Sequence, residues 1–189
     1  MDLAIRCENI KLRLAETIKQ CMKTGTADKI TVQQIVNLCG TTRQTFYRNF
    51  RDKNDLINWY FEKLLLESFA HMGEGKTINE GLVKKFRFIR QEQEFFTKAF
   101  KMDEQNCLKD YDFELIMEFY TNRIKQKTGK PLDEELQFLL EMYCRGSIYM
   151  TVKWVLSGMK LSPEELSQNL VNAIPPELAK LFSELKMIK

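Results

Sequence analysis

The sequence of 189 residues contains a single histidine, His71, and this scarcity limits the chemistry available to the chain. A metal site with two histidine ligands is excluded, and a catalytic base would have to be a less common side chain. The sequence also has no glycine-rich phosphate loop and no nucleophile elbow. We therefore expect a protein that is not an enzyme and has neither a metal site nor a cofactor. His71 falls near the end of an expected helix, a position that the helix dipole favours for a cationic side chain.

Cysteine pairs of the Cys-x-x-Cys type are also missing, and the number of cysteines is odd. Because Cys21 and Cys39 take apolar positions of expected helices, we interpret the cysteines as small hydrophobic side chains in a reducing compartment. A redox switch is the alternative, since it depends on a thiolate-favouring environment that a sequence does not reveal. The five cysteines are Cys7, Cys21, Cys39, Cys107 and Cys144.

No apolar run approaches the roughly 18 residues of a membrane span. The first nine residues include Asp2, Arg6 and Glu8, so they do not follow a signal-peptide pattern. With 44% apolar and 29% charged residues, the chain is long enough to bury a sizeable core. We expect a globular protein of the cytoplasm with no membrane partner.

The net charge of +3 is unevenly distributed along the chain. Residues 1–60 hold ten Lys and Arg against six Asp and Glu, whereas residues 61–189 hold nineteen against twenty. The first part therefore carries +4 and the second −1. Excess positive charge is expected where phosphates are bound, although a solvated basic face gives the same pattern. Charge alone does not separate these two interpretations.

The segment from Thr31 to Leu56 favours phosphate binding over a solvated basic face, because its pattern is that of a helix-turn-helix. Thr31 and Gln34 form a capping-box pattern that begins one helix, and Gly40 provides a residue that tolerates the positive φ of a turn. A second helix follows with Thr42 as its cap. Phe46 and Phe50 lie on one side of this helix, and the polar side chains on its other faces include no acid. Helix, turn and a polar second helix are typical of a motif whose second helix enters the DNA major groove.

This segment resembles the DNA-binding signature of TetR-type transcription regulators. The signature residues are Thr31, Val32, Ile35, Gly40, Thr45, Tyr47, Phe50, Lys53 and Leu56. The resemblance implies a homodimer on a near-palindromic operator in double-stranded DNA, most often a repressor relieved by a small effector. Arg43 and Gln44 have the right shape for bidentate contacts to guanine and adenine. We expect the DNA-binding residues to be Thr31, Thr41, Thr42, Arg43, Gln44, Thr45, Tyr47, Arg48, Asn49 and Lys53.

The rest of the chain is expected to be helical, which makes the fold all-α. A scaffold helix precedes the motif from about residue 8 to 24, and a long helix capped by Asp52 follows it and links two domains. Residues 1–51 would form a three-helix DNA-binding domain, and residues 52–189 a helical-bundle domain for dimerisation and sensing. Helices are predicted at residues 79–91, 92–101, 108–127, 133–157, 163–173 and 176–187.

The second domain is rich in methionine and aromatic residues, the usual material of adaptable apolar pockets, although most of them should be core. We expect any effector to contact Phe86, Phe96, Phe100, Phe119 and Tyr120. The segments FFTKAF and GSIYMTVKWVLSGM resemble the TetR-type subgroup of the dihydroxyacetone-kinase operon regulator. That resemblance implies a partner protein as the alternative to a small apolar effector, in an activator or co-regulator. An enclosed cavity would favour the effector, and a closed core with an exposed apolar patch would favour the partner.

The segment from Asp133 to Ser157 is apolar around much of its circumference, so it lies either at the centre of its domain or against a second subunit. We predict an isologous four-helix contact in which Leu166 and Leu170 take part. The alternative is that these residues close the core of one subunit. The predicted interface consists of Val152, Trp154, Val155, Leu156, Leu166 and Leu170.

Overall fold

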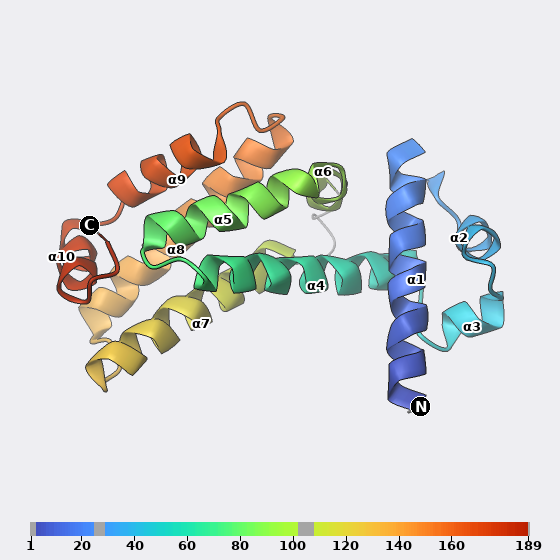
Figure 1. Ribbon diagram of the computed structural model, residues 1–189, viewed down its shortest axis with the longest axis horizontal. Helices are drawn as coiled ribbons and strands as arrows, with labels where there is room; N and C mark the ends of the chain where they lie inside the picture. The colour runs from blue at the N-terminus through green and yellow to red at the C-terminus, as the bar shows by residue number, and fades with distance from the viewer. Residues whose placement is uncertain (1–2, 25–28, 102–107, 189) are drawn as a thin grey trace. The chain divides into compact units, whose positions relative to one another are not determined.

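The computed structural model describes residues 3–24, 29–101 and 108–188, which form ten α-helices and no strand (Figure 1). The predicted all-α fold is therefore confirmed, and each predicted helix is present with ends shifted by a few residues. The helices are α1 Leu3–Thr24, α2 Val32–Cys39, α3 Arg43–Tyr47, α4 Lys53–Gly73, α5 Ile78–Gln91, α6 Gln93–Lys101, α7 Leu108–Thr128, α8 Glu134–Leu156, α9 Pro163–Asn172 and α10 Pro176–Glu184.

The chain divides into two compact units. Unit 1 consists of Met1–Leu64 and Glu94–Leu108, and unit 2 consists of Leu65–Gln93 and Lys109–Lys189. Helix α4 contributes its first part to unit 1 and its last part to unit 2. This division lies further along the chain than the boundary predicted after residue 51.

The core of unit 1 explains the difference. Phe61 of α4 is fully buried and makes edge-to-face ring contacts with Phe96 and Phe100 of α6, with centroid distances of 5.6 and 5.4 Å. These aromatic contacts attach α6 to the first part of α4. The Tyr60 hydroxyl of α4 in turn donates to the Glu16 carboxylate of α1 at 2.8 Å. The expected apolar faces of the N-terminal helices are buried as well. They consist of Leu14, Ile18 and Met22 in α1, Ile35 and Val36 in α2, and Phe46 in α3.

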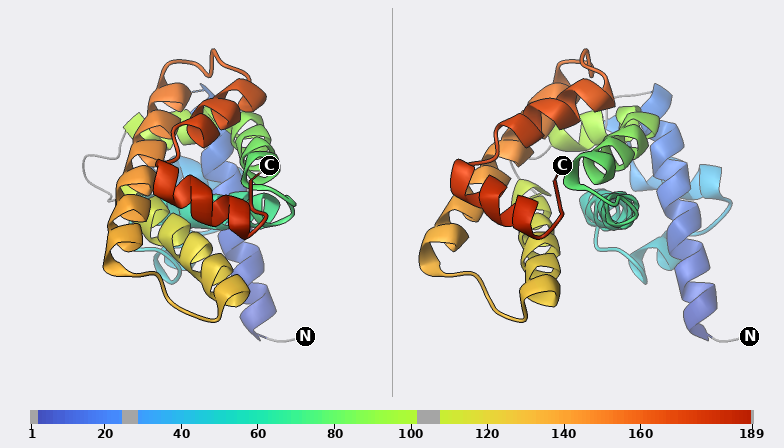
Figure 2. Two further views of the ribbon diagram at one scale, coloured as in Figure 1. Left: turned by 90° about the vertical axis from the view of Figure 1, so that its left-hand side faces the viewer. Right: turned by 60° about the vertical axis from the view of Figure 1, so that its left-hand side comes forward.

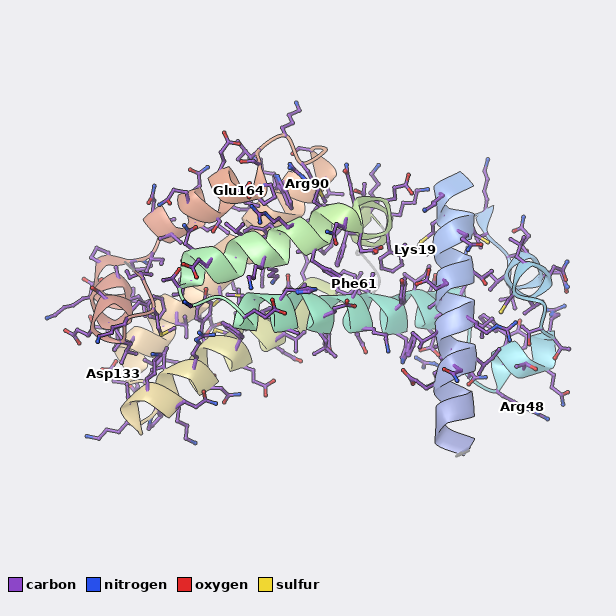
Figure 3. The ribbon with its side chains drawn as sticks, in the orientation of Figure 1. Lys19, Arg48, Phe61, Arg90, Asp133 and Glu164 are labelled. Atoms are coloured by element: carbon purple, nitrogen blue, oxygen red, sulfur yellow. The ribbon has the colours of Figure 1, made fainter. Side chains whose placement is uncertain are left out.

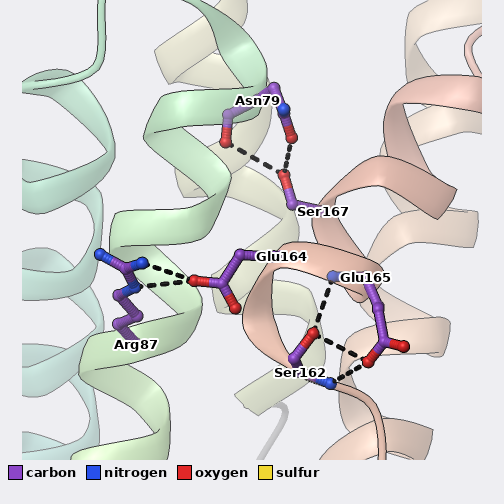
Figure 4. Close-up of polar contacts among 6 residues, drawn as sticks. All are labelled: Asn79, Arg87, Ser162, Glu164, Glu165 and Ser167. Atoms are coloured by element: carbon purple, nitrogen blue, oxygen red, sulfur yellow. Dashed lines mark hydrogen bonds and ion pairs between the residues drawn. The ribbon is translucent and has the colours of Figure 1, made fainter.

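Unit 2 is organised around the pairing of α5 with α9, which lie side by side in Figures 1 and 2. Helix α9 starts with a capping box in which Ser162 and Glu165 exchange hydrogen bonds, and Pro163 occupies its first position. Along the same pair of helices, the Ser167 hydroxyl donates to the side-chain oxygen of Asn79, and the Arg87 guanidinium donates twice to the Glu164 carboxylate (Figure 4). Polar contacts therefore set the register of α9 on α5.

Candidate nucleic-acid interface

Helix α2 begins and ends where the sequence predicts. The Thr31 hydroxyl accepts from the Gln34 backbone N–H at 3.2 Å, while the Gln34 side chain accepts from the Thr31 backbone N–H at 2.8 Å. At the other end Gly40 adopts φ 65° and ψ 40°, the left-handed conformation that glycine takes without steric cost. The predicted capping box and turn are thus confirmed.

Helix α3 has only five residues, so its position depends on its neighbours more than on its own hydrogen bonds. Thr42 caps it by accepting from the Thr45 backbone N–H at 3.1 Å. Phe46 is completely buried and contacts Phe50, with 6.0 Å between ring centroids. One side of α3 is therefore anchored in the core of unit 1, and the opposite side is turned outward.

The outward side of α3 holds the polar residues proposed to bind DNA. Arg43, Gln44 and Arg48 are exposed, and Tyr47 is 49% exposed. Figure 3 shows Arg48 beside α3. The Arg43 guanidinium lies 5.9 Å from the centre of the Tyr47 ring, a cation–π distance that favours a defined position for the guanidinium. The outward side of α3 and its C-cap therefore present three hydrogen-bonding side chains and the half-exposed Tyr47, with no acid among them.

The other predicted DNA-binding residues surround this face in unit 1. Thr31 is exposed, and Thr41 is half-buried in the turn before α3. The Asn49 amide donates to the Thr45 carbonyl at 2.8 Å and so supports the end of α3. Lys53, in the first turn of α4, donates from its ammonium to the Ile30 carbonyl at 3.0 Å.

The five aromatic residues predicted to bind an effector do not fall in one unit. Phe96 and Phe100 pack on Phe61 in unit 1, whereas the other three belong to unit 2. Tyr120 is fully buried and stacks on Phe182, with 5.7 Å between ring centroids.

Phe119 contributes to a cleft in unit 2 that also involves Met72 and Arg123. Its volume is about 10 Å³, which is room for about one water molecule. Phe86 packs beside Trp154 instead, with 5.6 Å between ring centroids. Phe86, Phe96, Phe100 and Tyr120 are thus buried in the cores of their units, and Phe119 is half-buried. Their contact with an effector stays a prediction.

Most residues of the predicted dimer interface are already buried within a single chain. Val152, Trp154, Val155, Leu166 and Leu170 are each between 0 and 6% exposed in a single chain. Side chains that their own chain already covers have almost no surface left to bury against another subunit. These five residues belong to the core of unit 2, and Leu156 is the one member of the predicted set that is exposed, at 41%. A second subunit at this surface stays a prediction.

A different face of α8 is uncovered and was missed in the sequence. Phe138, Met142 and Tyr149 are 64, 59 and 66% exposed. Together with Leu156 they are spaced by four and seven residues, so they share one face of the helix. We call these four residues the α8 stripe. The spacing was visible in the sequence, but the apolar residues on the other sides of α8 concealed it.

The remaining candidate groups form no further site among the described residues. Those residues contain no group of three or more side chains able to hold a metal ion, and none of their helices is long and apolar enough to cross a membrane. His71 lies in the last turn of α4, as expected, with its Nδ1 atom 3.5 Å from the Glu74 carboxylate. Cys21, Cys39 and Cys144 are buried free thiols, and the side chains of Cys7 and Cys107 lie outside the described residues.

A capped α2, a glycine turn and an outward polar α3 place the chain in the class of helix-turn-helix DNA-binding proteins. The model of a transcriptional regulator C-terminal region of the TetR type matches residues 76–175, which is more than half of the chain. The chain therefore belongs to the TetR family of transcription regulators, a family of DNA-binding proteins that are not enzymes.

Similar proteins cover nearly the whole chain. It is 26% identical over 172 residues to the HTH-type dhaKLM operon transcriptional activator DhaS of Lactococcus lactis subsp. lactis strain IL1403, covering 89% of this chain and 90% of that protein. The solved structure of the dihydroxyacetone kinase operon activator DhaS has a TM-score of 0.64 at 19% identity, covering 95% and 98% of the two chains. The TetR family repressor AlkX from Dietzia sp. strain DQ12-45-1b has a TM-score of 0.62 at 16% identity, covering 90% and 95%. Both solved structures share the fold of this chain.

Proposed function

We propose that this regulator reads a specific operator through Arg43 and Gln44 of α3. The observation that carries the proposal is the acid-free outward face of α3, with both side chains exposed at the start of the helix. Arg suits the O6 and N7 acceptors of guanine, and Gln suits the N6 and N7 atoms of adenine. Thr42, Thr45 and Arg48 flank them on the same short helix and its cap.

Phosphate contacts would fix the position of α3 in the groove. Thr31 lies at the start of α2 and Lys53 at the start of α4, and backbone N–H groups at helix starts favour anions. The exposed Tyr47 hydroxyl belongs to the outward face of α3. We assign all three residues to the DNA backbone, with Thr41 and Asn49 as supports of the segments that carry them.

The experiment for base reading compares Arg43→Ala and Gln44→Ala on the operator and on random DNA of the same length. Each variant should lose about 1–3 kcal/mol on the operator and little on random DNA, because only the operator offers matching base edges. Lys53→Ala is the matched comparison. It should weaken binding to both DNAs and flatten the salt slope by about one. Equal losses on both DNAs for Arg43→Ala and Gln44→Ala would refute base reading.

We further propose a homodimer on a near-palindromic operator, joined through the α8 stripe. A single helix-turn-helix gives too little contact for specific binding, and two copies related by a twofold axis match half-sites about one DNA turn apart. An isologous contact needs an apolar surface that is open in one chain. The α8 stripe meets this requirement, and a Cβ atom added to Gly146, four residues after Met142, would have no neighbouring atom within 4 Å.

Dimerisation is tested with Tyr149→Glu and Phe138→Glu, measured by sedimentation and circular dichroism. Both variants should be folded monomers that have lost operator binding, because a carboxylate would be buried in an apolar contact. Leu66→Glu is the matched control, since Leu66 is a 50% exposed apolar residue on another helix, and it should remain dimeric. Leu166→Glu should unfold the chain, because Leu166 is core. Dimeric Tyr149→Glu and Phe138→Glu proteins would place the interface elsewhere.

For the direction of regulation we propose activation through a partner protein, in the cytoplasm, over repression relieved by a small apolar effector. The similar protein from Lactococcus lactis is named as an activator. In addition, four of the five aromatic residues expected to bind an effector are buried, and they are divided between the two units. A reporter gene placed behind the operator should lose expression when the regulator is deleted. Increased expression on deletion would instead support repression.

A further inference from the structure

Helix α2 is held at both ends by cationic side chains from neighbouring helices. The Arg13 guanidinium of α1 donates from Nη2 to the Cys39 carbonyl at 2.8 Å, at the last residue of α2. The Lys53 ammonium of α4 donates to the Ile30 carbonyl at 3.0 Å, just before the Thr31 cap. Both bonds connect residues far apart in the sequence, and both partners are backbone carbonyls.

The Arg13 bond falls at the turn that determines the direction of α3. Carbonyl groups in the last turn of a helix have no partner within the helix, and the negative end of the helix dipole lies there. The backbone N–H of Gly40 donates to the Asn37 carbonyl, and that of Thr41 donates to the Val36 carbonyl. The Arg13 guanidinium donates to the Cys39 carbonyl, and Cys39 is a buried residue with 7% exposure. Arg13 thus satisfies the carbonyl immediately before the glycine on which the chain turns.

Helix α3 needs such external support because it is so short. Phe46 fixes one side of the helix in the core, but an anchor at one point leaves rotation about that point possible. The second constraint comes from residues 40–42, which join α3 to the end of α2. Holding Cys39 therefore limits the directions in which Arg43 can point.

We propose that Arg13 is a positioning residue for operator recognition, which acts through the Cys39 carbonyl and the turn and touches no DNA. The proposal rests on the proposed reading of bases by Arg43. A protein whose binding-competent orientation is less populated binds its operator more weakly in proportion. Random DNA is bound through phosphates, so it depends less on the direction of Arg43.

The test compares Arg13→Met with the unchanged protein on the operator selected from genomic fragments and on a random duplex of the same length. Arg13→Met should bind the operator about tenfold more weakly, the equilibrium factor expected for one charge-assisted hydrogen bond, and the random duplex nearly unchanged. The salt slope on the operator should stay the same, because no phosphate contact is lost. Arg13→Lys, which keeps one donor and the charge, should recover part of the lost discrimination.

Two comparison variants make the outcome specific. Lys23→Met removes one cation from the last turn of the same helix and should leave the ratio of operator to random binding unchanged. Arg43→Ala tests the proposed function itself on the same two duplexes. If Arg43→Ala lowers the ratio but Arg13→Met does not, the positioning role is wrong and base reading stands.

Three further results would overturn the proposal. A salt slope lower by about one for Arg13→Met would make Arg13 a phosphate contact. Equal weakening on both duplexes with an unchanged slope, accompanied by a lower unfolding midpoint, would mean a general structural role. If Arg43→Ala also leaves the ratio of operator to random binding unchanged, α3 does not read bases. Arg13 would then have no base-reading residue to position.

Discussion

The buried ion pair in unit 2 allows a sharp prediction about stability. Lys85 of α5 and Asp112 of α7 lie 3.4 Å apart between Nζ and Oδ1, and their side chains are 4 and 3% exposed. The Lys85 ammonium also lies 3.8 Å from the centre of the Phe69 ring of α4. Removing one charge leaves the other buried without compensation, at a cost of about 3–5 kcal/mol. For a chain of this size, Lys85→Met should therefore lower the melting temperature by roughly 6–20 °C.

The double variant Lys85→Met/Asp112→Leu separates the loss of attraction from the burial of a lone charge. It should be close to the unchanged protein in stability, because two apolar side chains of similar volume replace two desolvated ions. Arg87→Met is the surface control. It opens the ion pair with Glu164, whose side chains are 63 and 50% exposed, and should leave the midpoint nearly unchanged.

Urea unfolding followed by circular dichroism gives the free energies for this cycle. A Lys85→Met protein that is as stable as Arg87→Met would refute the reasoning. So would a double variant that loses as much stability as the two single variants together.

Two further predictions concern the packing and ionisation of unit 2. A Cβ atom on Gly75 would lie 2.3 Å from the Gly81 backbone nitrogen, so Gly75→Ala should destabilise the chain by about 1–3 kcal/mol in urea unfolding, while Gly73→Ala, with its nearest neighbour at 4.0 Å, should not. Burial raises the pKa of the Cys144 thiol from its ordinary value of 9.0 to about 12. Because the folded chain keeps a proton that the unfolded chain releases, the stability from this group is present below pH 9 and falls as the pH rises from 9 to 12. Cys144→Ala should reduce that fall in stability, and an identical pH profile would contradict the burial argument.

The DNA-binding segment could be predicted from sequence because its structure is determined locally. The Thr31–Gln34 capping box, the positive φ of Gly40 and the Thr42 cap depend on residues within a few positions of one another. Local hydrogen bonds leave a clear trace in sequence, and those predictions are confirmed.

The interface and the effector site depend on contacts between distant segments, and there the sequence was ambiguous. Helix α8 is apolar on several sides, and nothing local shows which side its own chain covers. Trp154 packs on Phe86 of α5, and its ring N–H donates to the Leu161 carbonyl at 2.9 Å, so that side is core. Likewise Phe96 and Phe100 belong with Phe61, more than thirty residues earlier in the chain.

Long-range bonds from surface cations were equally invisible in the sequence. Arg13 reads as an ordinary exposed residue of α1, and only the fold brings it to the Cys39 carbonyl. Lys53 matches the family signature, yet its bond to the Ile30 carbonyl joins residues 23 positions apart. Such bonds follow from helix packing and not from any local pattern.

Base reading by α3 requires that the protein select one specific DNA sequence. The most direct measurement is selection of genomic fragments by the purified protein, followed by sequencing, in parallel with Arg43→Ala and Gln44→Ala. We expect enrichment of one short near-palindromic site with half-sites about one DNA turn apart, and loss of that enrichment in both variants. Absence of any enriched site, or the same site enriched by both variants, would contradict base reading by α3.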